Sequence, residues 1–253
     1  MFLEKTTYPS YSSTQIFRDL FCKYKKRISI ENDEYKIEFN TITQKEKHLI
    51  EYILYRIQIE KTSKIKFNIK EYLDFIGLKS NNIQNRKNLI KRLQSLSSLD
   101  IFYTHKKENI ISKHNLYSIQ IEENQTLFCD IEISDFMKWV KNTKTKKVKK
   151  YLCPFNTEWE LLIEDYLQME TKYKNKKQFK YRSFTLFNVL RYLGIINDEM
   201  DYNLMLVKDK KYYRDRITHS LKVIKKEFHF LPHYKYKDGM FKVLKPKLKN
   251  LRK

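Results

Sequence analysis

The chain has 253 residues, of which 41% are hydrophobic and 15% aromatic, enough for one large hydrophobic core or two ordinary ones. Its 52 Lys and Arg residues exceed its 30 Asp and Glu residues, and the formal charge of +22 predicts a surface that attracts nucleic acid. Three widely spaced cysteines argue against a structural zinc site, and no apolar run approaches the roughly 20 residues that span a bilayer, so we expect a cytoplasmic protein without a membrane segment.

The first third of the chain predicts an arm followed by two helices. Residues 1–27 are rich in Ser, Thr and Tyr before the basic run "CKYKKR", which indicates a partly ordered arm. "YKIEFN" alternates like a strand, and after Thr43 the apolar residues of "QKEKHLIEYILYRIQ" recur at helical spacing. A short strand, "KIKFN", then precedes the helix "IKEYLDFIG", which Asn68 caps and Gly77 ends.

A basic helix and a hairpin follow. "NNIQNRKNLIKRLQSLSS" places four apolar residues on one face and its amide and basic residues largely on the other. The alternating stretches "LYSIQIE" and "TLFCDIEI", separated by "ENQ", predict a hairpin. The order of helix, short strand, helix, glycine turn, basic helix and hairpin is typical of a winged helix-turn-helix unit.

The same order recurs in the second half of the chain. Residues 141–150 carry six lysines and predict a linker or a solvated loop. "TEWELLIEDYLQMETKY" predicts a helix, "FKYRS" a short strand, and "FTLFNVLRYLG" a second helix that ends at Gly194. "KKYYRDRITHSLKVIKKEFHF" predicts a basic third helix, and the Asp-Gly pair at Gly239 predicts the tight turn of a final hairpin.

These patterns predict an α+β protein with two winged helix-turn-helix domains in tandem, related by an internal pseudo-repeat. Gly77 and Gly194 are expected to turn the chain from the second helix into the third, and Gly239 to form the hairpin tip. The expected boundaries are an arm at 1–27, a first domain at 28–140, a basic linker at 141–150, and a second domain with a basic C-terminal tail at 151–253.

This arrangement resembles the iteron-binding replication initiators of bacterial plasmids, over about residues 28–247. The likeness rests on the order of "FNTITQKEKHLIEYILYRI", "FNIKEYLDFIGL" and "RKNLIKRLQSLSSLDIF", and then of "WELLIEDYLQM", "FTLFNVLRYLGI" and "YYRDRITHSLKVIKKEFHF". It implies that a monomer binds directly repeated origin sites, that a homodimer forms through the first domain, and that the host replicative helicase and its loader are partners. The long acidic segment "INDEMDYNLMLVKD" after Gly194 departs from the family pattern and leaves open the angle of the second basic helix on DNA.

The third helix of each domain is expected to lie in a major groove of double-stranded DNA, where Arg pairs with guanine and Asn or Gln with adenine. We expect the second domain to read most of the sequence, and the resemblance implies weaker DNA contacts for the first. For each residue the alternative is a phosphate contact or an ordinary solvated side chain. The candidate DNA-binding residues are Asn85, Arg86, Lys87, Lys91 and Arg92 in the first domain, and Arg214, Arg216, His219, Lys222, Lys226, Lys235, Lys237 and Lys242 in the second.

The expected function is sequence-specific DNA binding that initiates plasmid replication, with no catalytic residue, metal or cofactor. The chain lacks the glycine-rich loop of an ATPase, and it lacks two histidines one residue apart, so a rolling-circle nicking enzyme is a minor alternative. A winged-helix transcription regulator without an origin function needs the same helices and stays open. A coding sequence rich in A and T, which inflates lysine, is the competing explanation of the charge.

Overall fold

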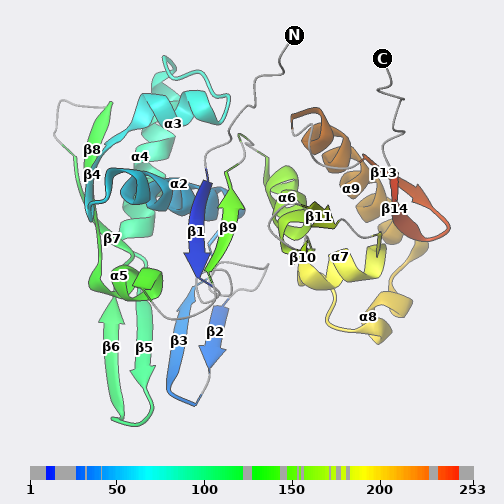
Figure 1. The fold of residues 1–253 in the computed structure, drawn as a ribbon, viewed down its shortest axis with the longest axis horizontal. Coiled ribbons are helices and arrows are strands. Elements are labelled where there is room, and N and C mark those ends of the chain that lie inside the picture. The colour runs from blue at the N-terminus through cyan, green and yellow to red at the C-terminus, as the bar shows by residue number, and fades with distance from the viewer. Residues whose placement is uncertain are drawn as a thin grey trace. The chain divides into compact units, whose positions relative to one another are not determined.

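The computed structural model divides the chain into two compact units, Met1–Asn156 (unit 1) and Thr157–Lys253 (unit 2). Both combine helices with small antiparallel sheets, so the protein is α+β (Figure 1). Among the described residues, no helix is both long and apolar enough to cross a membrane. The structure describes residues 10–14, 27–31, 33–40, 42–121, 127–142, 147–152, 154, 157–170, 172–174, 178–180, 183–227 and 233–244.

The described part of unit 1 holds four helices and three sheets. Figure 1 shows the four-stranded sheet at the opposite end of the unit from α3. The helices are α2 (Gln44–Glu60), α3 (Ile69–Phe75), α4 (Ile83–Ser97) and α5 (Asp135–Asn142). The strands are β4 (Lys64–Asn68), β8 (Phe128–Ile133) and β7 (Tyr117–Gln120) in one sheet; β2 (Arg27–Glu31), β3 (Tyr35–Asn40), β5 (Ile101–His105) and β6 (Ile110–His114) in the next; and β1 (Ser10–Thr14) with β9 (Lys147–Tyr151) in the third.

The long helix α2 begins with a capping box and runs through the core of unit 1. The Thr43 hydroxyl accepts a hydrogen bond from the Glu46 backbone, and the Glu46 carboxylate accepts one from the Thr43 backbone. Leu49, Ile53 and Ile57 recur at helical spacing and are almost fully buried, as the sequence predicted. The helix thereby provides the surface on which α3 and the three-stranded sheet pack.

The helix α3 ends in a left-handed turn at Gly77, which has a φ of +71°. The Leu78 amide donates to the Leu73 carbonyl at 2.8 Å, and the Gly77 amide donates to the Asp74 carbonyl at 3.1 Å. This pair of bonds is the Schellman motif, which satisfies the last carbonyls of a helix while the chain reverses. The predicted role of Gly77 in closing this helix is therefore confirmed.

Unit 2 repeats part of the order of unit 1, namely helix, short strand, helix, longer helix and hairpin, with other elements inserted. Its three-stranded sheet has the order β12-β14-β13, so the last strand lies in the middle, as β8 does in the sheet β4-β8-β7. The elements are α6 (Glu158–Glu170), β10 (Lys172–Lys174), β11 (Gln178–Lys180), β12 (Phe184–Thr185), α7 (Leu186–Tyr192), α8 (Glu199–Leu204), α9 (Val207–Glu227), β13 (His233–Lys237) and β14 (Met240–Leu244).

The turn at Gly194 reproduces the turn at Gly77. Gly194 also has a φ of +71°. The Ile195 amide donates to the Leu190 carbonyl at 3.0 Å, and the Gly194 amide donates to the Arg191 carbonyl at 3.1 Å. The same backbone device therefore ends the second helix of both units.

Several segments differ from their predictions. The expected linker at 141–150 contains the end of α5 and the strand β9, which pairs with β1 of the expected arm. The linker was predicted from its lysine content, which gives no information about the backbone hydrogen bonds that β9 forms with β1. Of the short strand predicted as "FKYRS", Phe179 and Lys180 lie in β11, whereas the strand that pairs with the hairpin is β12, which begins at Phe184, whose ring is buried. The hairpin β5–β6 and the helix α8 were not predicted.

Gly77→Ala should lower the free energy of unfolding by about 1–2 kcal/mol, because an alanine is strained at positive φ. A Cβ at Gly77 would have no heavy atom within 4 Å, so the cost comes from the backbone alone. Gly77→Asn is the matched control and should cost less, since asparagine tolerates the left-handed region. Urea titration measures both changes, and equal stability of all three proteins would contradict the assigned turn.

Candidate nucleic-acid interface

The start of α4 is fixed by asparagine side chains. The Asn82 Oδ1 accepts hydrogen bonds from the backbone amides of Gln84 at 2.8 Å and Asn85 at 3.3 Å, which caps the helix. The Asn85 Nδ2 donates to the Lys79 carbonyl at 3.0 Å, across the turn that follows α3. Asn85, predicted to contact DNA, is half-buried and holds this turn.

The buried residues of α4 show which of its side chains face solvent. Leu89, Leu93 and Leu96 are buried, so residues about half a turn away face solvent. Of the predicted residues, Lys87 and Lys91 are exposed, whereas Arg86 and Arg92 are half-buried beside the apolar stripe.

Two exposed amides on α4, Gln84 and Asn88, were not among the predicted site residues. The Gln84 Nε2 donates to the Asn88 Oδ1 at 2.7 Å, so the two side chains hold one another. Two features of the sequence could have identified them. The two amides are four residues apart and so lie on the same face of the helix, and the helix sequence contains no Asp or Glu.

The helix α9 is anchored by Ile217, Leu221 and Ile224, which are buried in unit 2. The opposite side presents a basic ridge, and on it the Arg216 guanidinium lies over the Tyr212 ring, 5.4 Å from the ring centre. The predicted residues on this exposed side are Arg216, His219, Lys222 and Lys226.

Arg214 differs from these residues because it is half-buried between α9 and the hairpin β13–β14. Its Nε and Nη2 donate to the Asp215 Oδ1 at 3.0 and 2.9 Å, and its guanidinium lies 5.5 Å from the centre of the Tyr236 ring of β13. The structure therefore places Arg214 in a contact between the third helix and the hairpin, next to the exposed carboxylate of Asp215.

The hairpin β13–β14 carries the three predicted lysines, of which Lys237 adjoins the turn and Lys235 and Lys242 lie opposite one another in the strands. Asp238 and Gly239 both have positive φ, 52° and 75°, as a two-residue turn with an Asp-Gly pair requires. Lys235 and Lys237 are exposed. Lys242 is half-buried, and its Nζ donates to the Asp238 Oδ2 at 2.7 Å.

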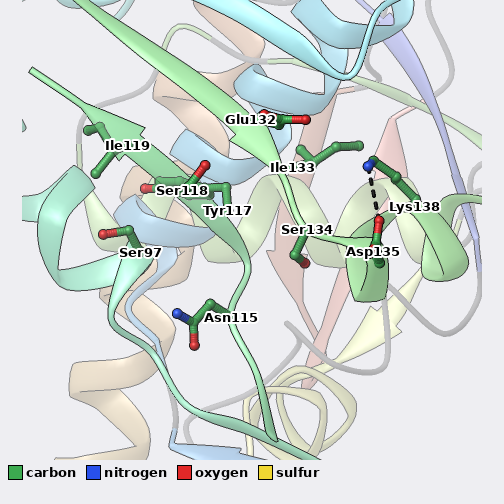
Figure 2. Close-up of a pocket in the computed structure, with 10 residues that line it drawn as sticks. All are labelled: Ser97, Asn115, Tyr117, Ser118, Ile119, Glu132, Ile133, Ser134, Asp135 and Lys138. Carbon is green, nitrogen blue, oxygen red and sulfur yellow. Dashed lines mark hydrogen bonds and ion pairs between the residues drawn. The ribbon is translucent and has the colours of Figure 1, made fainter.

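A polar hollow of about 510 Å³ lies in unit 1 where the end of α4 meets β7, β8 and α5 (Figure 2). Its wall holds the carboxylates of Glu132 and Asp135, and the Lys138 Nζ donates to Asp135 at 3.0 Å. Two carboxylates disfavour a phosphate. The residues that line the hollow are Ser97, Asn115, Tyr117, Ser118, Ile119, Glu132, Ile133, Ser134, Asp135 and Lys138.

Three potential nucleophiles of unit 1, Cys129, Tyr52 and Tyr72, are buried. Burial raises the pKa of the Cys129 thiol to about 12, and burial also raises the pKa of the Tyr72 and Tyr52 phenols. These groups stay protonated near neutral pH. Within the part of the chain that the structure describes, no group of three His, Cys, Asp or Glu side chains could hold a metal ion; His229 lies outside that part.

No protein-family model matches the sequence, and the curated proteins give no match either. A crystal structure of domains 2 and 3 of RctB is similar to the chain, with a TM-score of 0.50 and 10% sequence identity. The similarity covers 82% of this chain and 84% of that chain, so it extends over parts of both units. At this level of identity it demonstrates a related fold.

Asn82→Ala should destabilise unit 1 by about 1 kcal/mol, because two backbone amides at the start of α4 lose their acceptor. Ser95→Ala, on the exposed side of the same helix, is the control and should change stability by less than about 0.5 kcal/mol. Urea unfolding measures both variants. A loss of stability for Ser95→Ala as large as that for Asn82→Ala would remove the capping argument.

Proposed function

We propose that the chain is a sequence-specific double-stranded DNA-binding protein with two winged-helix domains, and that it initiates replication at directly repeated origin sites. The observation that carries the proposal is the repeated unit itself: in each unit a left-handed glycine turn ends the second helix, and a longer helix with an exposed polar face follows, directly as α4 in unit 1 and after the short α8 as α9 in unit 2. In a chain with a formal charge of +22, two such helices suit the major groove of DNA.

The three-stranded sheets support the winged-helix interpretation. In both units the strand before the second helix pairs with the last strand of the hairpin, in the orders β4-β8-β7 and β12-β14-β13. The hairpin β13–β14 then forms the wing of unit 2. Its exposed Lys235 and Lys237 would contact phosphates beside the groove that α9 occupies.

The helices α4 and α9 would have different roles in DNA binding. The exposed Arg216, His219 and Lys222 make α9 the main reader of bases, and the exposed Lys87 and Lys91 of α4 hold the phosphate backbone. Two fused, non-identical readers favour a long asymmetric site, repeated in one direction, over a palindrome. Footprinting on the DNA that flanks the gene tests this arrangement, and protection of a single palindrome would favour a transcription regulator instead.

The proposal includes a homodimer formed through unit 1, because its four-stranded sheet has an exposed apolar end. Ile110 and Ile111 of β6 are 54% and 71% exposed, and Phe102 of the neighbouring β5 is 42% exposed. Among the described strands β6 is terminal in the order β2-β3-β5-β6, so its outer edge can pair with a second copy. The host replicative helicase and its loader are proposed as partners on the family resemblance.

Binding to duplex DNA should weaken steeply with salt, because six to ten phosphate contacts release that many counterions. Affinity should drop on the order of a thousandfold or more between 50 and 200 mM salt. Lys237→Gln should lower the slope of log affinity against log salt by about one. Fluorescence anisotropy with a random duplex measures both slopes. An affinity independent of salt would refute nucleic-acid binding.

Arg216→Ala should weaken binding to the specific site by about 1–3 kcal/mol and relax the preference at one base position, because Arg216 is the exposed arginine of α9. Lys87→Ala should weaken binding to all sequences by a smaller and similar amount, because a phosphate contact carries no sequence information. Specific and random duplexes are compared for each variant at one salt concentration. If Lys87→Ala alters base preference while Arg216→Ala does not, the roles of the two units are reversed.

A further inference from the structure

The exposed face of α4 has a composition of its own. It carries three amides, two lysines, one serine and one aliphatic side chain, while both arginines of the helix are half-buried at its margins. The helix sequence contains no carboxylate. The exposed residues along this face are Ile83, Gln84, Lys87, Asn88, Lys91, Gln94 and Ser95.

We propose that α4 reads A·T base pairs directly, with Ile83 against the 5-methyl group of a thymine and Gln84 hydrogen-bonded to an adenine. The inference rests on the proposed DNA binding, and it adds base recognition to a helix that otherwise contributes phosphate contacts. In the major groove an A·T pair presents the adenine N7 acceptor, the adenine N6 donor and the thymine methyl group. A neighbouring amide and aliphatic side chain match these groups.

The geometry of Gln84 suits this role. One N–H of its Nε2 is bonded to the Asn88 Oδ1 at 2.7 Å, which fixes the direction of the amide. A side-chain amide has two N–H donors and a carbonyl acceptor. The second N–H of Gln84 can therefore donate to adenine N7 while its oxygen accepts from adenine N6, and Asn88 serves as a positioning residue.

Ile83 is 59% exposed at the first position of α4. A β-branched side chain has few rotamers, so little conformational entropy is lost when DNA covers it. The Asn82 cap fixes the backbone directly before it. The aliphatic group is therefore held next to Gln84 at the start of the helix that the winged-helix arrangement directs into the groove.

Unit 2 repeats the aliphatic position. The first residue of α9 is Val207, which is 84% exposed, and it follows the 59% exposed Leu206. The residue after Val207 is Lys208, whereas the residue after Ile83 is Gln84, so the amide does not recur. A β-branched aliphatic group at the same place in two third helices indicates a common contact, for which the thymine methyl group is the apolar feature of the major groove.

The experiment removes single methyl groups from the DNA. The full chain first selects its preferred duplex from a random pool at fixed salt, and each thymine is then replaced by deoxyuridine. For the wild-type protein, replacement at one thymine should weaken binding about fourfold, the value for one buried methyl group. In Ile83→Ala the thymine duplex should be weakened, and the same replacement should cause no further loss. Val207→Ala should abolish the effect at a different thymine.

Three matched variants complete the test. Ile59→Ala removes another exposed aliphatic group, 57% exposed on α2, and should retain the full difference between thymine and deoxyuridine. Lys87→Ala should weaken both duplexes equally, and Gln84→Ala should relax the preference for adenine beside the affected thymine. If Ile83→Ala retains the full difference, or if no replacement affects the wild-type protein, the inference fails while DNA binding stands. If no duplex is selected at any salt concentration, the proposed function itself fails.

Discussion

The left-handed glycine turn is the constraint on which the rest of each unit depends. Gly77 and Gly194 both have a φ of +71°. In both units the amide of the glycine and the amide of the next residue donate to equivalent carbonyls of the preceding helix. Because these bonds use up the last carbonyls of the second helix, the chain leaves that helix in one direction only. In unit 1 the next helix after this turn is α4, so the start of α4 and the set of its residues that faces solvent follow from this direction; in unit 2 the short helix α8 lies between the turn and α9.

The consequence is clearest on α4, where neighbouring residues have different roles. A shift of one residue rotates a helical position by about 100°, which separates the exposed Gln84 from the half-buried Asn85. Asn85 is bonded back to the turn through the Lys79 carbonyl, while Gln84 is bonded along the helix to Asn88. The turn, the Asn82 cap and the helix therefore form one rigid element whose exposed face is set by the backbone.

Elements with a strong period or a recognisable cap could be predicted from the sequence, and these include α2, α4, α9 and the two hairpins that join the three-stranded sheets. The hairpin β5–β6 could not, because its turn has no glycine and uses Asn109 at a φ of 53°. The acidic segment after Gly194 holds α8, whose start Asp198 caps through the Asp201 amide. In the candidate site, sequence predicted which helices are basic, but not that Asp215 and Asp238 bind Arg214 and Lys242, since such pairs depend on distances in the folded chain.

The Arg214–Asp215 and Lys242–Asp238 pairs show why the net charge of the protein and the charge at a contact surface have different effects. Net charge steers a protein toward DNA over about a Debye length, whichever surface carries it. At contact distance only the local groups count. On α9 the Arg214–Asp215 pair contributes little net charge, so Arg216 and Lys222 supply most of the positive charge in that part of the helix. On α4 the exposed amides Gln84, Asn88 and Gln94 are neutral, and neutral groups can discriminate between bases without adding to the affinity for every phosphate. In the proposed complex with DNA, this strongly basic chain would therefore gain specificity where its exposed faces are least charged.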